Sequence, residues 1–338
     1  NTTFEEVCYL LWHGELPNRG QLAQLKRRLA EERPLPPRLL DLLRQLPHDT
    51  HPMAALRTAV SALASFDPEA ETSSPEANYR KALRITAKMI TITAAFARLR
   101  SGGEPVEPRP DLGHAANLLY LLKGEEPDEL SARIVDTALT LHAEHGMNAS
   151  TFAARVTIAT LSDIYSAICS AIGTLKGPLH GGANEQVMEM LRSIGEPAHA
   201  ESWVRAALGR GEKVMGFGHR VYRTLDPRAP ILKRLAEELA ARGGHAWLEI
   251  SERVQAVMRE EMDRRGKPIY PNVDFFSASV YYTLGIPTDL FTNVFACARA
   301  AGWTAHVMEQ LQDNRLIRPD SDYIGPLNKK VVPIEERM

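Results

Sequence analysis

The chain has 338 residues, of which 44% are hydrophobic, enough to bury a substantial core in one large domain or two modest ones. Its 40 Lys and Arg residues nearly balance its 42 Asp and Glu residues, and the net charge of -2 gives no electrostatic basis for binding nucleic acid or an anionic membrane surface. We therefore expect a soluble globular protein in which any binding of anions is local.

The three cysteines and the most apolar stretch of the chain, residues 150–175, indicate the compartment in which such a protein is found. Cys8, Cys169 and Cys297 lie far apart in apolar helical contexts without a CxxC motif, so we expect reduced core thiols, no cysteine metal site and a cytoplasmic location. Residues 150–175 are interrupted by an arginine and an aspartate, which argues against a membrane span, and no signal peptide is evident. The chain begins at Asn1 rather than Met and enters a helix almost at once, so we expect native sequence to precede it.

Helical periodicity dominates the chain from its first residues. Thr3 and Glu6 form a candidate capping box for a helix that ends at Gly14. Apolar residues then recur at steps of three and four in the following sets: Leu22, Leu25 and Leu29; Leu130, Ile134, Ala138 and Leu141; Val187, Met190, Leu191 and Ile194; Trp247, Ile250, Val254, Val257 and Met258; and one long run, 291–311. Strand-like alternation is scarce, so the sequence predicts an all-α protein of about fifteen helices.

Polar segments rich in Pro or Gly mark the loops. We predict loops at residues 66–78 and 100–113. We also predict that residues 328–338 are extended and lie over a surface, either of this chain or of a partner subunit. No repeat of fixed period is present, which disfavours a helical-repeat solenoid.

His180 lies in the first of three places where Gly or Pro interrupts the helical pattern beside an ionisable side chain. In "GPLHGGANE", residues 177–185, Pro178 ends any preceding helix and the apolar period resumes at Val187, so His180 should lie at or just before a helix N-terminus. A histidine kept neutral there can donate a hydrogen bond to a developing oxyanion. The alternative is a capping histidine in a tight turn.

The second place is "GFGHRVYRTLDPRAP", residues 216–230, in which His219 follows a Gly-Phe-Gly turn. Asp226 is a candidate N-cap with Pro227 at the first helical position, and Arg228 adds a guanidinium to a helix N-terminus that already attracts anions. The alternative is a surface loop with solvated arginines, which we prefer for Arg223.

Asp274 stands among apolar residues in the third place, "YPNVDFFSASVYY". Burial would raise its pKa toward that of a useful general base, although Asp is also a favoured N-cap for a helix beginning at Phe275. Arg299 is a charge on an otherwise apolar helix, so it either reaches solvent or faces an anion. His142 and His145 are three residues apart at a helix end and lack the HExxH spacing of a zinc site. This set of residues suits acid–base chemistry on a polycarboxylate.

The whole chain resembles the citrate synthase family, most closely its short bacterial and archaeal forms. The resemblance rests on six motifs in the family's order: "HGELP", "EHGMNASTFAARV", "GPLHGGANE", "GFGHRVYRTLDPRAP", "YPNVDFFSA" and "RPDSDYIGP". It implies a large domain of residues 1–181 and 287–338, a small domain of residues 182–286 that closes over the ligands, and an obligate homodimer. The family usually carries a further N-terminal segment before the helix that begins here near Phe4, which agrees with the expectation that native sequence precedes Asn1.

The resemblance also implies a reaction and the residues that perform it. The reaction is the condensation of acetyl-CoA with oxaloacetate and water to citrate and CoA, without a metal or a permanently bound cofactor. Asp274 matches the base that removes a methyl proton, His180 the group that hydrogen-bonds the thioester oxygen, and His219 the group that polarises the oxaloacetate carbonyl. The remaining matches are His145, Arg228 and Arg299 for substrate binding, Arg318 for an arginine contributed across the dimer interface, Lys213, Val214, Met215, Gly216 and Phe217 for the CoA loop, and Arg19 for a substrate or dimer contact.

Three other functions stay open at this point. A 2-methylcitrate synthase would use propionyl-CoA, and Gly146 and Met147 favour citrate over it only modestly. A metal-dependent hydrolase would use His142, His145, His219 and Asp274. A non-catalytic helical scaffold would use the polar residues only as caps and surface.

Overall fold

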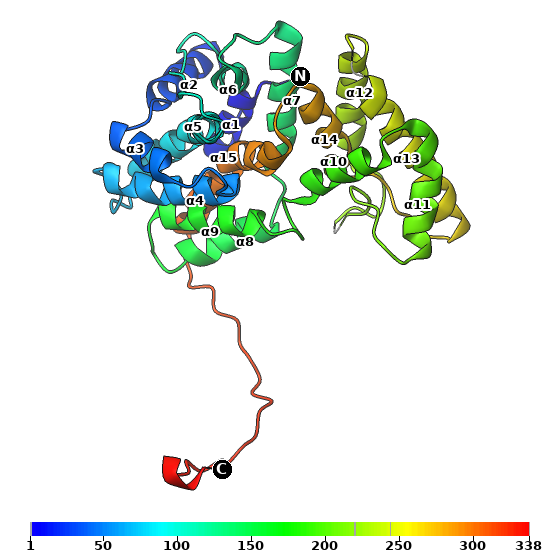
Figure 1. Ribbon diagram of the computed structural model, residues 1–338. Coiled ribbons are helices and arrows are strands. Elements are labelled where there is room, and N and C mark those ends of the chain that lie inside the picture. The colour runs from blue at the N-terminus through cyan, green and yellow to red at the C-terminus, as the bar shows by residue number, and fades with distance from the viewer. Residues whose placement is uncertain (1, 220, 244, 338) are drawn as a thin grey trace.

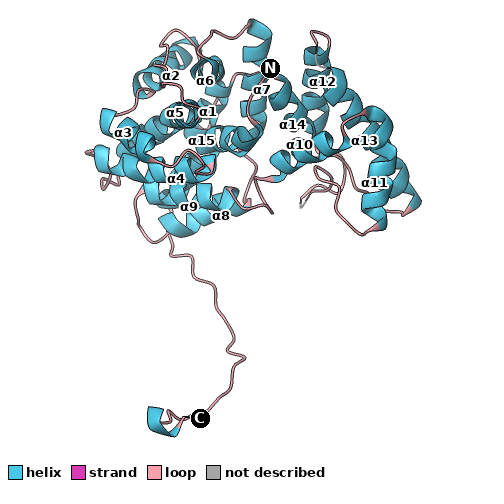
Figure 2. Cartoon of the chain, in the orientation of Figure 1, coloured by secondary structure: helices cyan, strands magenta, loops and turns pink. Residues whose placement is uncertain are grey.

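The computed structural model describes residues 2–219, 221–243 and 245–337. In these residues it contains fifteen α-helices and four short 3₁₀ helices and no strand, only an isolated bridge between Phe217 and Pro271. Figure 2 shows helices and loops alone. The all-α prediction is confirmed. Among the described helices, none is long and apolar enough to cross a membrane.

The helices form two groups that lie side by side (Figure 1). The larger group comprises α1 (Phe4–His13), α2 (Arg19–Glu32), α3 (Pro37–Gln45), α4 (Pro52–Leu63), α5 (Pro75–Arg100), α6 (His114–Lys123), α7 (Glu129–His142), α8 (Ala149–Ile158), α9 (Ile164–Leu175) and α15 (Phe291–Gln312). The smaller group comprises α10 (Ala183–Ile194), α11 (Ala200–Gly209), α12 (Ala229–Ala240), α13 (His245–Arg264) and α14 (Val273–Thr283). That residues 182–286 form a small domain that moves as a unit stays a prediction.

Local sequence sets most helix boundaries. At α1 the capping box of Thr3 and Glu6 is present and the helix ends at Gly14 in the left-handed conformation, as predicted. The predicted loop at 66–78 is wrong at its end, because Ser74 caps α5 and Pro75 begins it.

Helix α15 runs through the middle of the larger group. Every residue from Phe291 to Thr304 is buried, because the helix packs against α5, α8, α9, α7 and α1. A helix covered on all sides needs apolar residues around its whole circumference, and this explains the long apolar run in the sequence. A polar side chain between Phe291 and Thr304 is therefore enclosed by the protein. Cys8 and Cys297 are buried in the core as expected, whereas Cys169 is only half-buried.

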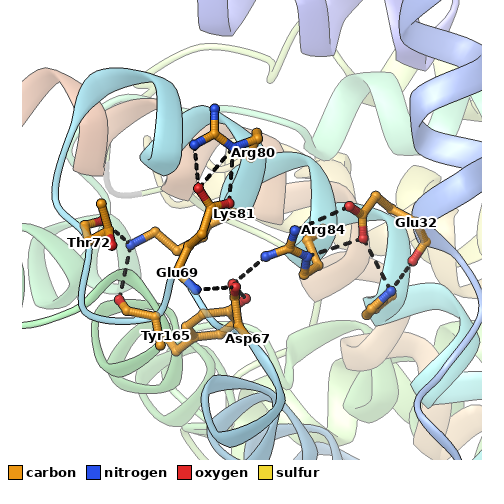
Figure 3. Close-up of polar contacts among 10 residues, drawn as sticks. Glu32, Asp67, Glu69, Thr72, Arg80, Lys81, Arg84 and Tyr165 are labelled. Carbon is orange, nitrogen blue, oxygen red and sulfur yellow. Dashed lines mark hydrogen bonds and ion pairs between the residues drawn. The ribbon is translucent and has the colours of Figure 1, made fainter.

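An ionic network joins α2, α5 and α9 (Figure 3). Asp67, in the loop before α5, accepts a hydrogen bond from the Tyr165 hydroxyl and pairs with Arg84, which also bonds to Glu32. Lys81 donates to the carbonyl of Thr72 at 2.7 Å. These contacts give buried charges on α5 the partners that they need. The network fixes the loop before α5 to the core.

The C-terminal segment leaves the body of the molecule after α15. Residues 313–337 extend away from both groups, with η4 (Ile334–Glu336) as their only helical turn among the described residues (Figure 1). Extended chain thus begins well before the predicted residue 328. Asn314 still donates to the carbonyl of Ala159 at 3.2 Å, and the described residues beyond it lead away from the helices (Figure 1). Its exposed large hydrophobic side chains are Leu316, Tyr323, Ile324, Leu327, Val331, Val332 and Ile334.

Candidate active site

His180 occupies the short link between α9 and α10. The amide of Gly181 donates to the carbonyl of Leu175 at 2.9 Å, and a Cβ at position 181 would lie 2.5 Å from that oxygen. Only glycine permits so close an approach, so this residue folds the link back against the end of α9. α10 begins at Ala183, which confirms that His180 lies just before a helix N-terminus.

Hydrogen bonds to Ser150 fix the tautomer of His180. The Ser150 amide donates to His180 Nε2 at 3.3 Å, and Ser150 Oγ lies 2.8 Å from the same nitrogen. Because an amide can only donate, Nε2 is the acceptor and Nδ1 carries the proton. Burial, and then the charge of Arg299, lower the pKa of His180 to about 4, so the ring is neutral near pH 7. The Nδ1–H group remains for a ligand.

The rings of His145 and His219 meet where the two groups of helices adjoin. Their centroids are 5.2 Å apart, and His145 Nε2 lies 3.0 Å from the Tyr222 hydroxyl. His219 Nδ1 accepts the amides of Val221 at 3.0 Å and Tyr222 at 3.1 Å, so its proton is on Nε2. Burial, followed by the charges of Arg228, His219 and Arg299, lowers the pKa of His145 to about 4. Burial also lowers the pKa of His219.

Arg228 is held by Asp226. Its Nη2 lies 2.8 Å from Asp226 Oδ2 and its Nε lies 3.0 Å from Oδ1, a bidentate pair that is buried on both sides. Asp226 Oδ2 also accepts the amide of Val273 at 3.2 Å. The predicted N-cap at Asp226 is wrong, because α12 begins at Ala229 with Arg228 in the cap position. Asp226 instead joins the loop before α12 to the start of α14.

Asp274 lies in the first turn of α14 rather than at its cap. The cap is Asn272, whose side chain accepts the Asp274 amide at 3.0 Å, so the alternative N-cap interpretation of Asp274 is wrong. Part of the residue is accessible, but Oδ1 is covered and has no hydrogen-bond partner among the described residues. Burial raises the pKa of Asp274 to about 7, although Arg228 and Arg299 act in the opposite direction. A carboxyl group with this pKa is suited to act as a base near neutral pH.

Arg299 is the electrostatic centre of the site. It is 1% exposed, which excludes a side chain that reaches solvent, and its Nε donates to the carbonyl of His142 at 2.6 Å. The guanidinium carbon lies 4.8 Å from the centre of the Phe295 ring. Its positive charge lowers the pKa of His145, of His180 and of Asp274.

The segment 213–217 lies beside the start of α14. Gly216 has a φ of +80°, and a Cβ there would lie 2.8 Å from the side chains of Phe275 and Val187. The carbonyl of Gly216 accepts the Asn272 amide at 2.9 Å, and Phe217 packs edge-on against Phe275 at 4.7 Å. Lys213 is exposed and Val214 is buried. The segment is thereby connected to the helix that carries Asp274.

Two of the predicted arginines lie outside this cluster. The Arg318 side chain is 77% exposed on the C-terminal segment, with Asp320 at 3.8 Å as its nearest ionic partner among the described residues. Arg19 begins α2 and is exposed, and α2 lies in the larger group, apart from α10 and α14 (Figure 1). Arg220, in the second motif, lies outside the described residues. Roles for Arg19 and Arg318 stay predictions.

His142 and His145, which we considered as a pair of metal ligands, have different surroundings. His142 is fully buried, with Nδ1 2.7 Å from the carbonyl of Ala138 and its ring against Phe295, whereas His145 points toward Tyr222. Across residues 2–219, 221–243 and 245–337, no group of three His, Cys, Asp or Glu side chains has a metal-holding arrangement. The geometry gives no support to the metal-dependent hydrolase.

Sequence reasoning missed the residues that support the histidines and arginines. Ser150 contacts His180 and accepts a hydrogen bond from Trp303 Nε1 at 3.1 Å. Tyr222 and Asp226 likewise act through contacts with their neighbours. The sequence pointed to Ser150, Tyr222 and Asp226 only through their positions within two of the six motifs.

The fold and the site together define a class: an all-helical enzyme equipped for acid–base chemistry beside buried arginines. The chain belongs to the citrate synthase family, whose model, described as "Citrate synthase, C-terminal domain", matches residues 1–320. It is 54% identical over 339 residues to citrate synthase 2 of Bacillus subtilis, with 100% of this chain and 90% of that protein covered. It is 46% identical over 332 residues to the 2-methylcitrate synthase of Mycobacterium tuberculosis, with 98% and 82% covered.

A solved structure supports the same relationship. The citrate synthase of Thermoplasma acidophilum, determined in a ternary complex with carboxymethyl coenzyme A and oxaloacetate, superposes with a TM-score of 0.93 at 35% identity. The match covers 99% of this chain and 89% of that one. Fold and family therefore agree with the resemblance seen in the sequence.

Proposed function

We propose that this protein condenses acetyl-CoA with oxaloacetate and water to give citrate and free CoA. One observation carries the proposal: the charge of buried Arg299 acts on two neutral histidines, His145 and His180, and on the Asp274 carboxyl group, whose pKa is about 7. A dicarboxylate supplies the anion that this arginine lacks, and Asp274 supplies a base that works near pH 7.

Oxaloacetate binds between the two groups of helices. Arg228 and Arg299 hold its carboxylates, and His145 donates a hydrogen bond beside them. The Nε2–H group of His219 points its dipole at the ketone oxygen, because the amides of Val221 and Tyr222 already occupy Nδ1. This polarises the carbonyl carbon that is attacked.

The thioester reacts through its enol. Asp274 takes a proton from the acetyl methyl group while the Nδ1–H group of His180 stabilises the negative charge that develops on the thioester oxygen. The methyl carbon then forms a bond with the ketone carbon, whose oxygen takes up a proton. Water cleaves the thioester of the product and releases CoA. Residues 213–217 hold CoA, and closure of residues 182–286 over the site excludes water until the new bond has formed.

The active protein is a homodimer in which Arg318 completes the site of the partner subunit. Support comes from the C-terminal segment, where Ile324 is 98% exposed and the Arg318 side chain is 77% exposed, with Asp320 as its ionic partner among the described residues. Exposed apolar side chains in series mark an interaction surface, and a second copy of the chain is the occupant that the family suggests. The protein is cytoplasmic, and the reaction needs no metal and no permanently bound cofactor.

The first experiment follows the loss of thioester absorbance with purified protein. We expect acetyl-CoA to be consumed only when oxaloacetate is present, and at the same rate with and without a chelator. Consumption without oxaloacetate, or none at all, contradicts the proposal. A higher kcat/KM with propionyl-CoA in the same assay would establish 2-methylcitrate synthesis instead.

The second experiment removes the acid–base groups one at a time. Asp274→Asn and His180→Ala should each lower kcat by about 10³-fold while oxaloacetate still raises the melting temperature, since neither side chain holds a carboxylate. Asp263→Asn, an exposed aspartate on α13, is the control. Near-normal turnover in either variant removes that residue from the mechanism.

The third experiment tests the shared site by mixing two variants. His180→Ala and Arg318→Ala should each be nearly inactive. After subunits exchange, a heterodimer regains one site with both residues intact, provided that Arg318 acts across the interface. A mixture no more active than its two components contradicts the shared site.

A further inference from the structure

The residues just before His145 are fixed to one face of α15. Three contacts join them to positions spaced by three and four along that helix: the carbonyl of His142 accepts from Arg299 Nε at 2.6 Å, that of Ala143 from the Gly302 amide at 3.1 Å, and the Glu144 carboxylate from His306 Nε2 at 2.9 Å. A helix presents such positions on one side, so the contacts form a continuous row. The row ends next to His145.

Gly302 makes this approach possible. A Cβ at position 302 would lie 2.3 Å from the carbonyl oxygen of Ala143 and 3.2 Å from the Glu144 side chain. The two segments are therefore as close as their backbones allow, and a larger side chain would push them apart.

Glu144 and His306 form the side-chain part of the row. Burial raises the pKa of Glu144, but hydrogen bonds from His306 and from the Gly146 amide lower it by more than burial raises it. The resulting pKa is about 2. His306 Nδ1 lies 3.0 Å from Arg155 Nη1, which can only donate, so Nδ1 is the acceptor and Nε2 carries the proton toward Glu144. A neutral imidazole thus links an arginine of α8 to the carboxylate beside His145.

The ring of His145 has no comparable support within its own group of helices. Its ring contacts among the described residues are with His219 and Tyr222, which lie between α11 and α12 in the smaller group. If that group moves, only the backbone of residues 142–146 holds His145 in place. Glu144 directly precedes His145 and ties this backbone to α15 through its own side chain.

We propose that Glu144, through its hydrogen bond with His306, is a positioning residue that holds His145 ready to bind oxaloacetate. The inference rests on the proposed function, because it assumes that His145 binds this substrate. The reaction would then depend on the Glu144–His306 hydrogen bond, although neither of these residues touches the substrate. Removing the bond should therefore weaken oxaloacetate binding and leave the acid–base steps nearly intact.

The test separates KM from kcat. In Glu144→Ala we expect the KM for oxaloacetate to rise about tenfold, with kcat and the KM for acetyl-CoA at saturating oxaloacetate changed less than about threefold. Glu144→Gln, which keeps an oxygen to accept from His306, should recover most of the affinity. Glu309→Gln is the matched control, because Glu309 also lies within 3.5 Å of His306 but is 65% exposed and is not joined to the backbone beside His145.

The Glu144–His306 hydrogen bond can also be removed by substituting His306 on α15. His306→Ala should raise the KM for oxaloacetate as Glu144→Ala does, and the double variant should be no worse than either single one, because both remove one interaction. His306→Ala also keeps the test open if Glu144→Ala does not fold. An unchanged KM in the folded variants, additive effects, or an equal loss of kcat and of both affinities overturns the inference. Failure of the proposed function is distinct, because it shows in the unaltered protein as the absence of oxaloacetate-dependent CoA release.

Discussion

The pH dependence of the rate tests the assignment of Asp274 as the base. Burial raises its pKa from 3.8 to about 7 in the free protein, while Arg228 and Arg299 act to lower it. Bound oxaloacetate would offset both positive charges, so in the complex the pKa should be no lower than about 7. A base must be ionised to work, and the ionised fraction falls tenfold for each pH unit below the pKa.

The expected magnitude follows directly. At saturating oxaloacetate, kcat/KM for acetyl-CoA should be constant above about pH 8 and about 100-fold lower at pH 5. Burial lowers the pKa of His145 and of His180 to about 4, so neither of these two rings titrates in this range.

The assay measures initial rates from the loss of thioester absorbance between pH 5 and 9. Melting temperatures at each pH separate loss of activity from unfolding. A midpoint at or below about pH 5 would refute the reasoning, because it would mean that the carboxyl group is solvated or that another group limits the rate.

Three further substitutions test the supports of the site and of the fold. Ser150→Ala should lower kcat about tenfold and leave the KM for oxaloacetate unchanged, because it removes a hydroxyl that orients His180; a changed KM alone would contradict this. Gly216→Ala, whose Cβ meets Phe275, should lower kcat/KM for acetyl-CoA about tenfold, and an unchanged value would show that the segment yields freely. Asp67→Asn should lower the free energy of unfolding in urea at pH 7 by about 3 kcal/mol. Burial raises the pKa of Asp67, but hydrogen bonds from Tyr165, the Glu69 amide and Arg84 lower it overall, so this difference should persist down to about pH 4, the ordinary pKa of an aspartate, and be lost as the pH falls through the lower pKa of the folded protein. A surface-like loss of under about 1 kcal/mol would show that the pair is solvated.

The helices could be predicted because their signals are local. The capping box at Thr3 and Glu6 and the uninterrupted apolar run of α15 each specify one element without reference to the rest of the chain. Caps near the site were harder to predict. Asp226 and Asp274 are good N-caps by residue type, but Asp226 pairs with Arg228 and Asn272 caps α14, so tertiary contacts decided between equivalent local choices.

The members of the site could be proposed from the sequence, but their chemical states could not. That His180 is protonated on Nδ1 follows from Ser150, which lies thirty residues away, and that His219 is protonated on Nε2 follows from two amides of its own loop. The expected effect of the helix N-terminus on His180 gave the right direction for its pKa, whereas burial and Arg299 are the causes found. Such contacts depend on distances through space, which residue spacing does not encode.

Helix α15 places a limit on how this chain can change in length. One residue inserted into an α-helix turns everything beyond it by about 100° and moves it by about 1.5 Å. An insertion between Arg299 and Trp303 would leave Arg299 in place but rotate Trp303 away from Ser150 and His306 away from Glu144. Deletions would do the same in the opposite sense. Homologous chains should therefore accept insertions in the loop at 101–113 and none within these two turns of helix, whatever substitutions they carry there.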